Sequence, residues 1–169
     1  MNYSGIIGSD IANGEGVRVS LFVSGCRHHC KGCFNPDTWD FSAGEPWTAE
    51  TREKVISACA PVHIQGLSLL GGEPFEPENQ KELLPLLREF RAKFGRSKDV
   101  WCYTGCVLET QLRAPSQWRC AETDEMLSLI DVLVDGPFIE EQKNISLAFR
   151  GSSNQRILRL GRASGGPAT

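Results

Sequence analysis

Three cysteines in one short segment have the spacing of a metal centre. Cys26, Cys30 and Cys33 follow the pattern C-x3-C-x2-C, directly after the apolar run Val17–Val23. Three thiolates this close can bind three irons of a cubic iron–sulfur cluster, whereas electron-carrier clusters are held by four cysteines. No fourth cysteine stands at matching spacing, so one iron would be open to a substrate or cosubstrate. The spacing therefore predicts chemistry at the cluster, and not only storage of an electron.

Zinc binding and disulfide formation are the alternatives for these cysteines. Zinc takes four ligands, and His28 and His29 lie in the loop, but structural zinc sites usually consist of two spaced pairs and no clean second pair follows. We assign neither histidine a ligand role. The seven cysteines are an odd number, and Met1–Glu15 lacks the basic start and apolar run of a secretory signal. We therefore expect a reducing cytosol, where clustered cysteines usually bind metal or take part in catalysis.

Length and composition predict one small domain. The 169 residues suit a single domain, expected over residues 1–160, with a disordered Gly-, Ala- and Ser-rich tail at 161–169. Acidic residues number 21 and basic residues 18, and no long basic run supports nucleic-acid binding. No apolar stretch approaches the roughly 18 residues of a membrane span. A cytoplasmic protein is expected.

Apolar runs alternate with helical patterns along the chain. Strands are predicted at Val17–Val23, Leu67–Leu70, Val100–Tyr103, Val132–Val134 and Arg156–Leu160, and helices at Thr48–Ala60, Glu78–Phe94 and Glu122–Ile130. Thr48 and Gly95 are predicted helix caps, Thr123 or a neighbour should cap the third helix, and Pro85 should kink or shorten the second. This alternation predicts an α/β fold with a mostly parallel sheet. The strands are too few for a closed eight-stranded barrel, so an open partial barrel is expected.

The motifs follow strands, and ligands of parallel α/β folds bind at the carboxyl ends of strands. The cysteine loop follows the first strand, and later strands end at Gly71-Gly72-Glu73, Thr104-Gly105 and Asp135-Gly136. Glycines let backbone approach a ligand closely, and Glu73 adds an acceptor, so this second loop suits an ammonium group. An ordinary turn with a solvated glutamate is the alternative. Among the other cysteines, Cys102 and Cys106 are expected to be structural, and Cys59 and Cys120 inert.

Several segments together resemble one protein family. The cysteine motif is that of the radical S-adenosylmethionine superfamily. The surrounding sequence is similar to the activating proteins of anaerobic (class III) ribonucleoside-triphosphate reductase, over about residues 1–158. The segments that carry this resemblance are Asn13–Arg18, Leu21–Cys26, Gly66–Pro74, Val132–Phe138 and Phe149–Gln155.

The resemblance implies a cofactor set and its binding residues. A [4Fe-4S] cluster would be held by Cys26, Cys30 and Cys33, in a partial barrel of the radical S-adenosylmethionine type. Gly71, Gly72 and Glu73 would hold the amine of S-adenosyl-L-methionine. Gly32, Cys33 and Phe34 would lie beside this cosubstrate, with Phe34 against the adenine or in simple packing, and Asp135 is a further candidate. Arg18, Asp135, Arg150 and Asn154 match family segments, and a salt bridge or turn that holds the fold is the alternative role for each.

The resemblance also implies a reaction and partners. The reduced cluster would cleave S-adenosylmethionine to methionine and a 5′-deoxyadenosyl radical, which takes a hydrogen atom from a glycine of the reductase. A flavodoxin- or ferredoxin-like donor would supply the electron, and the reaction would require the absence of oxygen. The alternatives are an activator of another glycyl-radical enzyme, a small-molecule radical enzyme, and a non-catalytic iron–sulfur or zinc module.

Overall fold

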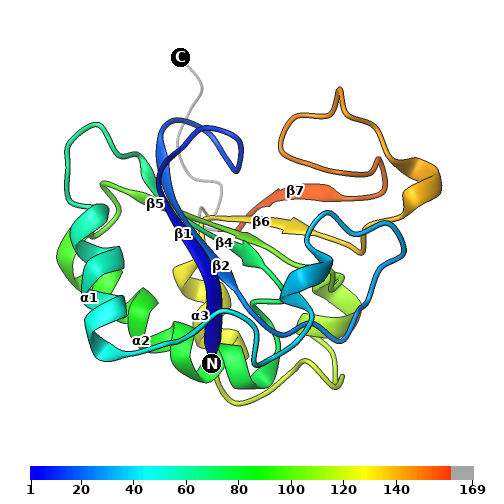
Figure 1. The fold of residues 1–169 in the computed structure, drawn as a ribbon, viewed down its shortest axis with the longest axis horizontal. Coiled ribbons are helices and arrows are strands. Elements are labelled where there is room, and N and C mark those ends of the chain that lie inside the picture. Colours follow the sequence, from blue (N-terminus) through cyan, green and yellow to red (C-terminus); the bar gives the residue numbers. More distant parts are fainter. Residues whose placement is uncertain (161–169) are drawn as a thin grey trace, which may run out of the picture.

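Seven strands form one mixed sheet in the computed structural model, which describes residues 1–160. The order across the sheet is β3-β1-β2-β4-β5-β6-β7. Figure 1 shows the sheet, with every strand labelled except the short β3. The strands are β1 (Asn2–Asp10), β2 (Arg18–Val23), β3 (Glu45–Pro46), β4 (Gly66–Gly71), β5 (Asp99–Tyr103), β6 (Val132–Asp135) and β7 (Arg156–Arg159). The tail predicted to be disordered, 161–169, lies outside the described residues.

The centre of the sheet is parallel and its edges are antiparallel. Strands β2, β4, β5 and β6 pair in parallel, while β1 and β3 add antiparallel strands at one edge and β7 at the other. The prediction of an α/β fold with a mostly parallel centre is confirmed. Sequence reasoning missed β1, because Asn2–Asp10 contains two glycines and no clear apolar alternation.

Three α-helices connect the parallel strands: α1 (Ala49–Ala58), α2 (Pro77–Phe94) and α3 (Thr123–Leu129). Thr48 caps α1 as predicted, accepting a hydrogen bond from the Thr51 amide at 3.2 Å, and Gly95 ends α2 with a φ of 55°. The predicted shortening at Pro85 is wrong, because α2 continues through it. Buried leucines on both sides of Pro85 offset the cost of a helix proline, about 3 kcal/mol. The cap of α3, predicted as Thr123 or a neighbour, is the neighbour Glu122, and Thr123 is the first residue of the helix.

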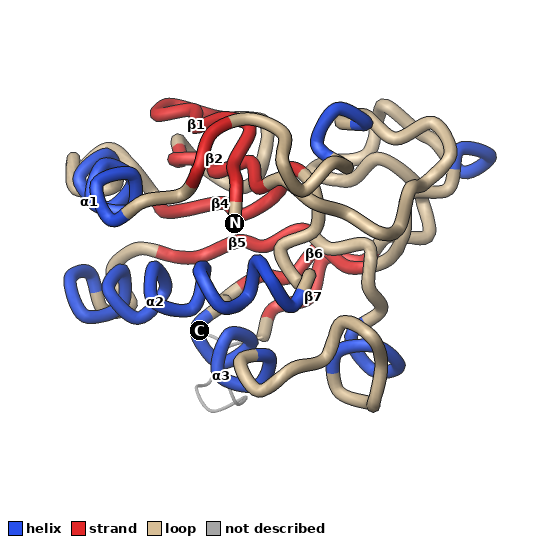
Figure 2. Tube along the Cα trace, turned by 60° about the horizontal axis from the view of Figure 1, so that its bottom comes forward, coloured by secondary structure: helices blue, strands red, loops and turns tan. Residues whose placement is uncertain are grey.

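The helices cover one face of the sheet, with α2 and α3 side by side in Figure 2. Val19 and Leu21 of β2, Leu67 and Leu69 of β4, and Leu133 of β6 point into this core, as strand alternation requires. The side chains between them point to the other face. Short helices η1 (Pro36–Thr38), η2 (Leu108–Leu112) and η3 (Glu140–Gln142) lie in the connections. None of the helices described is long and apolar enough to cross a membrane.

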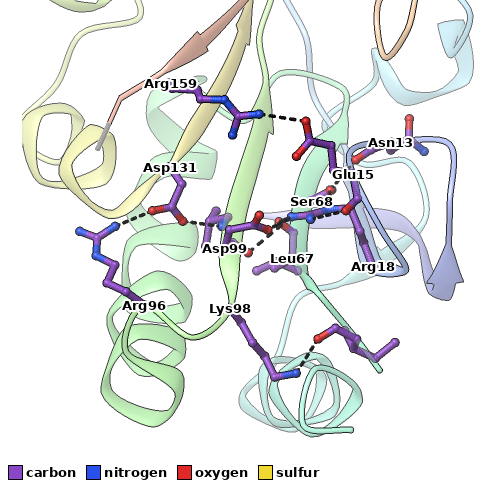
Figure 3. Close-up of polar contacts among 12 residues, drawn as sticks. Asn13, Glu15, Arg18, Leu67, Ser68, Arg96, Lys98, Asp99, Asp131 and Arg159 are labelled. Atoms are coloured by element: carbon purple, nitrogen blue, oxygen red, sulfur yellow. Dashed lines mark hydrogen bonds and ion pairs between the residues drawn. The ribbon is translucent and has the colours of Figure 1, made fainter. Parts of the chain in front are cut away.

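A buried arginine ties together the amino ends of three parallel strands (Figure 3). Arg18 is fully buried, donates to Ser68 Oγ at 2.8 Å and to the Leu67 carbonyl at 3.0 Å, and pairs with Asp99 at 2.6 Å. Its guanidinium lies 5.5 Å from the Trp101 ring centroid. Arg18 therefore has the fold-holding role that was one reading of its match to the family. The opposite, carboxyl edge of the strands is left to the loops (Figures 1 and 2).

Candidate functional site

One cavity of about 500 Å³ brings the predicted motifs together at the carboxyl edge of the parallel strands. Loops that follow four strands line it. The lining residues include the three motif cysteines, Phe34, Gly71, Gly72, Glu73, Thr104, Gly105, Gly136 and Arg150. Phe22, Leu70 and Tyr103 form its floor from the sheet face that carries no helices. The four strand ends therefore meet at one cavity, as expected, and its role as a binding site stays a prediction.

The cysteine loop is anchored on both sides. The Arg27 amide donates to Glu76 Oε1 at 2.7 Å, and its guanidinium pairs with Glu76 and Glu78 at the start of α2. The Gly25 amide donates to the Thr38 carbonyl at 2.8 Å. Gly25 has a φ of 97°, and a Cβ there would overlap the Phe41 ring, so a larger residue does not fit. These contacts hold the thiols at the cavity before any metal binds.

The three thiols fit the ligand set of an iron–sulfur cluster. All three line the same cavity, none forms a disulfide, and Cys30 and Cys33 are half-buried. Burial and the charge of Glu73 raise the pKa of Cys26 to about 12, and burial also raises the pKa of Cys30. The thiols of Cys26 and Cys30 are therefore harder to ionise than ordinary cysteine thiols when no metal is bound. A bound cation would supply the charge that stabilises thiolates so close to one another.

The glycines of the second loop permit close packing of backbone on backbone. Gly71 has a φ of 105°, and a Cβ there would lie 2.7 Å from Val23 backbone atoms. A Cβ at Gly72 would lie 2.5 Å from the Gly25 carbonyl oxygen. Both glycines line the cavity, where a cosubstrate could reach them. The predicted contact with a cosubstrate stays a prediction. Because glycine has no side chain, Gly71 and Gly72 also allow this loop to pack directly against β2 and the cysteine loop.

Glu73 joins three loops. It is almost fully buried, and its carboxylate accepts from the Phe75 amide, Thr104 Oγ1 and the Gly105 amide, each at 2.8 Å. His28 Nε2 lies 3.0 Å from its second oxygen. The alternative reading of Glu73 as a solvated turn residue is wrong. Its predicted contact with an ammonium group remains a prediction, since four protein donors already surround the carboxylate.

Sequence reasoning gave His28 no role, and the structure places it in this network. Burial lowers the pKa of His28, but the hydrogen bond and charge of Glu73 outweigh it, so the net shift is upward. The imidazole stacks on Trp118 with centroids 4.5 Å apart. Cys106 Sγ lies 3.6 Å from Nε2, and the three side chains place ligand-type atoms within 4.8 Å of one another. No spacing along the chain predicts that His28, Glu73 and Cys106 meet, because they come from three separate loops.

The residues after Cys33 lie at the mouth of the cavity. Phe34 lines it, is 59% exposed, and contacts Phe138 with ring centroids 5.0 Å apart. Gly32 is placed differently: a Cβ there would meet the Glu140 carboxylate at 2.8 Å, and the residue does not line the cavity. The predicted proximity of these residues to a cosubstrate stays a prediction, with Phe34 the better placed of the two.

Asp135 does not line the cavity. Its carboxylate accepts from Arg156 Nε at 2.9 Å, from Arg156 Nη2 at 2.6 Å and from the Leu108 amide at 2.9 Å. The residue is almost fully buried, and its neighbour Gly136 is the one that lines the cavity. This geometry matches the fold-holding reading of Asp135, not the binding one.

Three of the other cysteines, Cys59, Cys102 and Cys120, lie away from the cavity. Cys59 and Cys102 are fully buried in the main core, and burial raises the pKa of both thiols. Cys120 is half-buried beside α3. None of these three lines the cavity described above.

The chain belongs to a class of proteins that bind a single iron–sulfur cluster. Residues 12–158 match a family model described as a 4Fe-4S single cluster domain. This span includes the cysteine loop and the other loops that line the cavity.

Curated relatives narrow the class to one family. The chain is 41% identical to the anaerobic ribonucleoside-triphosphate reductase-activating protein of Escherichia coli (strain K12) and 43% identical to that of Haemophilus influenzae. Each alignment covers 95% of this chain and 99% of the relative. The protein of the same name from Enterobacteria phage T4 is 38% identical over 93% of each chain. The chain therefore belongs to the family of anaerobic ribonucleoside-triphosphate reductase-activating proteins, and the predicted resemblance is confirmed.

Proposed function

We propose that the chain is a radical S-adenosylmethionine enzyme that activates an anaerobic ribonucleoside-triphosphate reductase by placing a radical on one of its glycines. The observation that carries the proposal is the convergence of Cys26, Cys30 and Cys33 on one cavity, without a fourth thiol among its lining residues. The activity named for the relatives agrees with it. An iron without a protein ligand is the position where a cosubstrate would bind.

The proposed chemistry requires a cluster and a cosubstrate in this cavity. A reduced cluster held by Cys26, Cys30 and Cys33 would supply one electron to the sulfonium of the cosubstrate, and breakage of the carbon–sulfur bond would give methionine and the radical that takes a hydrogen atom from the glycine. The chain's own residues position these groups. Glu73 and His28 hold the cysteine loop against the Gly71-Gly72 loop. The half-buried Cys30 and Cys33 leave the cluster side open to the cavity.

The cosubstrate would lie between the cysteine loop and the glycine loop. Gly71 and Gly72 offer backbone to its amino group, and Phe34 offers an exposed ring at the mouth for the adenine. Fixed placement matters because a primary carbon radical reacts with whatever group lies nearest. We also infer that the sheet is an open partial barrel. Support comes from helices on one face and the cavity on the other, with only four parallel strands.

The remaining parts of the proposal concern partners and place. A low-potential donor of the flavodoxin or ferredoxin type would reduce the cluster, because a sulfonium is difficult to reduce. The reductase would present its glycine loop at the cavity mouth, and no oxygen should be present during the reaction. The cytoplasmic location stays a prediction, which agrees with clustered cysteines that form no disulfide.

The proposal is tested by adding S-adenosylmethionine to the anaerobically reconstituted and reduced protein. The electron paramagnetic resonance signal of the cluster should change, since only an open iron can bind the amino-acid part of the molecule. A Cys102→Ala variant is the matched control and should respond like the wild type, because Cys102 lies in the core. A cluster signal that is indifferent to S-adenosylmethionine would instead favour an electron carrier, and tetrahedral zinc without iron would favour a structural module.

A further inference from the structure

An arginine that lines the cavity has no acidic partner. Most arginines in the described part of the chain pair with a carboxylate, as Arg18 and Arg156 do. Arg150 makes no ion pair within residues 1–160 and donates a single hydrogen bond, from Nη1 to the Gln155 carbonyl at 3.0 Å. Its Nε is buried without any partner. Buried donors are nearly always satisfied, so this guanidinium lacks an acceptor that a ligand would supply.

The backbone around Arg150 is fixed in an uncommon conformation. The preceding residue, Phe149, has a φ of 55°, a value that residues other than glycine rarely adopt. Its ring packs on Trp101 with centroids 5.3 Å apart. On the other side, Gln155 Oε1 accepts from the Gly151 amide at 2.9 Å. Such conformations persist where surrounding contacts enforce them, and they occur often at ligand sites.

The same loop touches the cysteine loop. A Cβ at Gly151 would lie 2.7 Å from the Phe34 ring, which follows Cys33 directly. Arg150 is thus one residue from a contact with the proposed cluster loop, and both residues line the cavity. The other ionisable side chains that line the cavity besides the cysteines include Glu73 and His28, which pair with each other at 3.0 Å, and donors already surround the Glu73 carboxylate. The free positive charge in this part of the cavity is therefore that of Arg150.

We propose that Arg150 binds the carboxylate of the methionine part of S-adenosylmethionine, through the guanidinium edge formed by Nε and Nη2. The inference rests on the proposed function and deepens it. With Nη1 engaged by Gln155, the two remaining donors lie on one side of the planar group. Arginine binds carboxylates through two parallel hydrogen bonds of this kind, and the pairing is strongest where water is excluded. Arg150 would orient the amino acid end, while the glycine loop receives the amine.

The experiment compares two ligands on the anaerobically reconstituted protein. S-adenosylmethionine and decarboxylated S-adenosylmethionine differ only in the carboxylate, and equilibrium dialysis gives a Kd for each. Arg150→Gln should weaken binding of S-adenosylmethionine by about tenfold or more, and should change the Kd of the decarboxylated compound by less than about twofold. Arg150→Lys keeps the positive charge but cannot form two parallel hydrogen bonds. Its Kd for S-adenosylmethionine should therefore lie between those of the wild type and Arg150→Gln.

An arginine-to-glutamine control separates charge from contact. Arg113 is exposed, pairs with no carboxylate in the described chain and does not line the cavity, so Arg113→Gln should leave both affinities unchanged. Equal weakening of both ligands in Arg150→Gln, or no weakening of either, would overturn the proposal. Loss of the cluster or of thermal stability in that variant would make Arg150 a structural residue and would overturn it too. Failure of the wild type to bind S-adenosylmethionine would instead reject the proposed function itself.

Discussion

Replacing Gly72 by alanine tests whether the two loops must touch. The new Cβ would lie 2.5 Å from the Gly25 carbonyl oxygen, about 0.9 Å closer than ordinary van der Waals contact, and 3.0 Å from the Thr38 carbonyl oxygen. Both atoms belong to backbone that cannot rotate away. The Gly25 carbonyl accepts from the Glu73 amide at 2.8 Å, and the Thr38 carbonyl accepts from the Gly25 amide at 2.8 Å. Relief of the clash must stretch these bonds and shift the cysteine loop.

The expected cost follows from these contacts. Two weakened hydrogen bonds contribute about 0.5–1.5 kcal/mol each, and overpacking adds about 1–3 kcal/mol, so the free energy of unfolding should fall by about 4 kcal/mol. At about 2–4 °C per kcal/mol for a chain of this size, Tm should fall by about 8–16 °C. Iron content after reconstitution should fall as well, because the shifted loop carries Cys26.

Thermal unfolding followed by circular dichroism, together with iron analysis, measures both effects. Gly8→Ala is the matched control, since a Cβ at Gly8 in β1 meets nothing within 4 Å, and its Tm should stay within about 2 °C of the wild type. If Gly72→Ala kept its Tm and iron and lost only affinity for S-adenosylmethionine, the glycine would serve the ligand and not the packing of the loops. Retention of all three properties would refute the steric argument.

Three further outcomes are expected. Changing Cys26 to alanine should abolish the [4Fe–4S] absorption and paramagnetic signals, while Cys106→Ala should retain both; loss of the cluster in the second variant would add Cys106 to the ligands. Thr104→Val removes the hydroxyl that donates to Glu73 and accepts from the Cys106 amide, and should lower stability by about 1–3 kcal/mol in a thermal melt; an unchanged melt would count against this network. Arg18→Met leaves buried acceptors unpaired and should cost about 3 kcal/mol in urea unfolding, whereas a neutral effect would show that water replaces the guanidinium.

The sequence was sufficient to predict the centre of the fold and the place of the site. Continuous apolar runs gave the four parallel strands, and the rule that ligands bind at strand carboxyl ends placed Cys26 and Gly71 at one edge before any coordinates. Strand β1 was missed because its pairing with β2 depends on tertiary contacts and not on its own composition. Pro85 was overestimated as a helix breaker, since core packing offset the local cost.

The finer arrangement of the site was beyond sequence reasoning, because it arises between loops distant in the chain. The Glu73–His28 pair joins residues 45 positions apart, and no periodicity predicts it. Gly72 was expected to make room for a ligand, whereas the nearest obstacle to a side chain is the Gly25 backbone. From the sequence, Asp135 was a candidate for binding the cosubstrate, whereas Arg150 was only a member of a matched segment. Their partners distinguish them: Asp135 is paired with Arg156, and Arg150 is unpaired among the described residues.

Whether the chain places a radical on a polypeptide glycine is tested most directly by electron paramagnetic resonance. The reconstituted protein, a reductant and S-adenosylmethionine are mixed anaerobically with the cognate anaerobic reductase, and a Cys30→Ala variant serves as the control. The wild type should produce a glycyl doublet on the reductase and roughly one 5′-deoxyadenosine per radical, because each activation consumes one hydrogen abstraction, and the variant should produce neither. A reductase that stays free of radical while a small metabolite is turned over many times would contradict the activating role. The protein would then be a radical enzyme that acts on a small molecule.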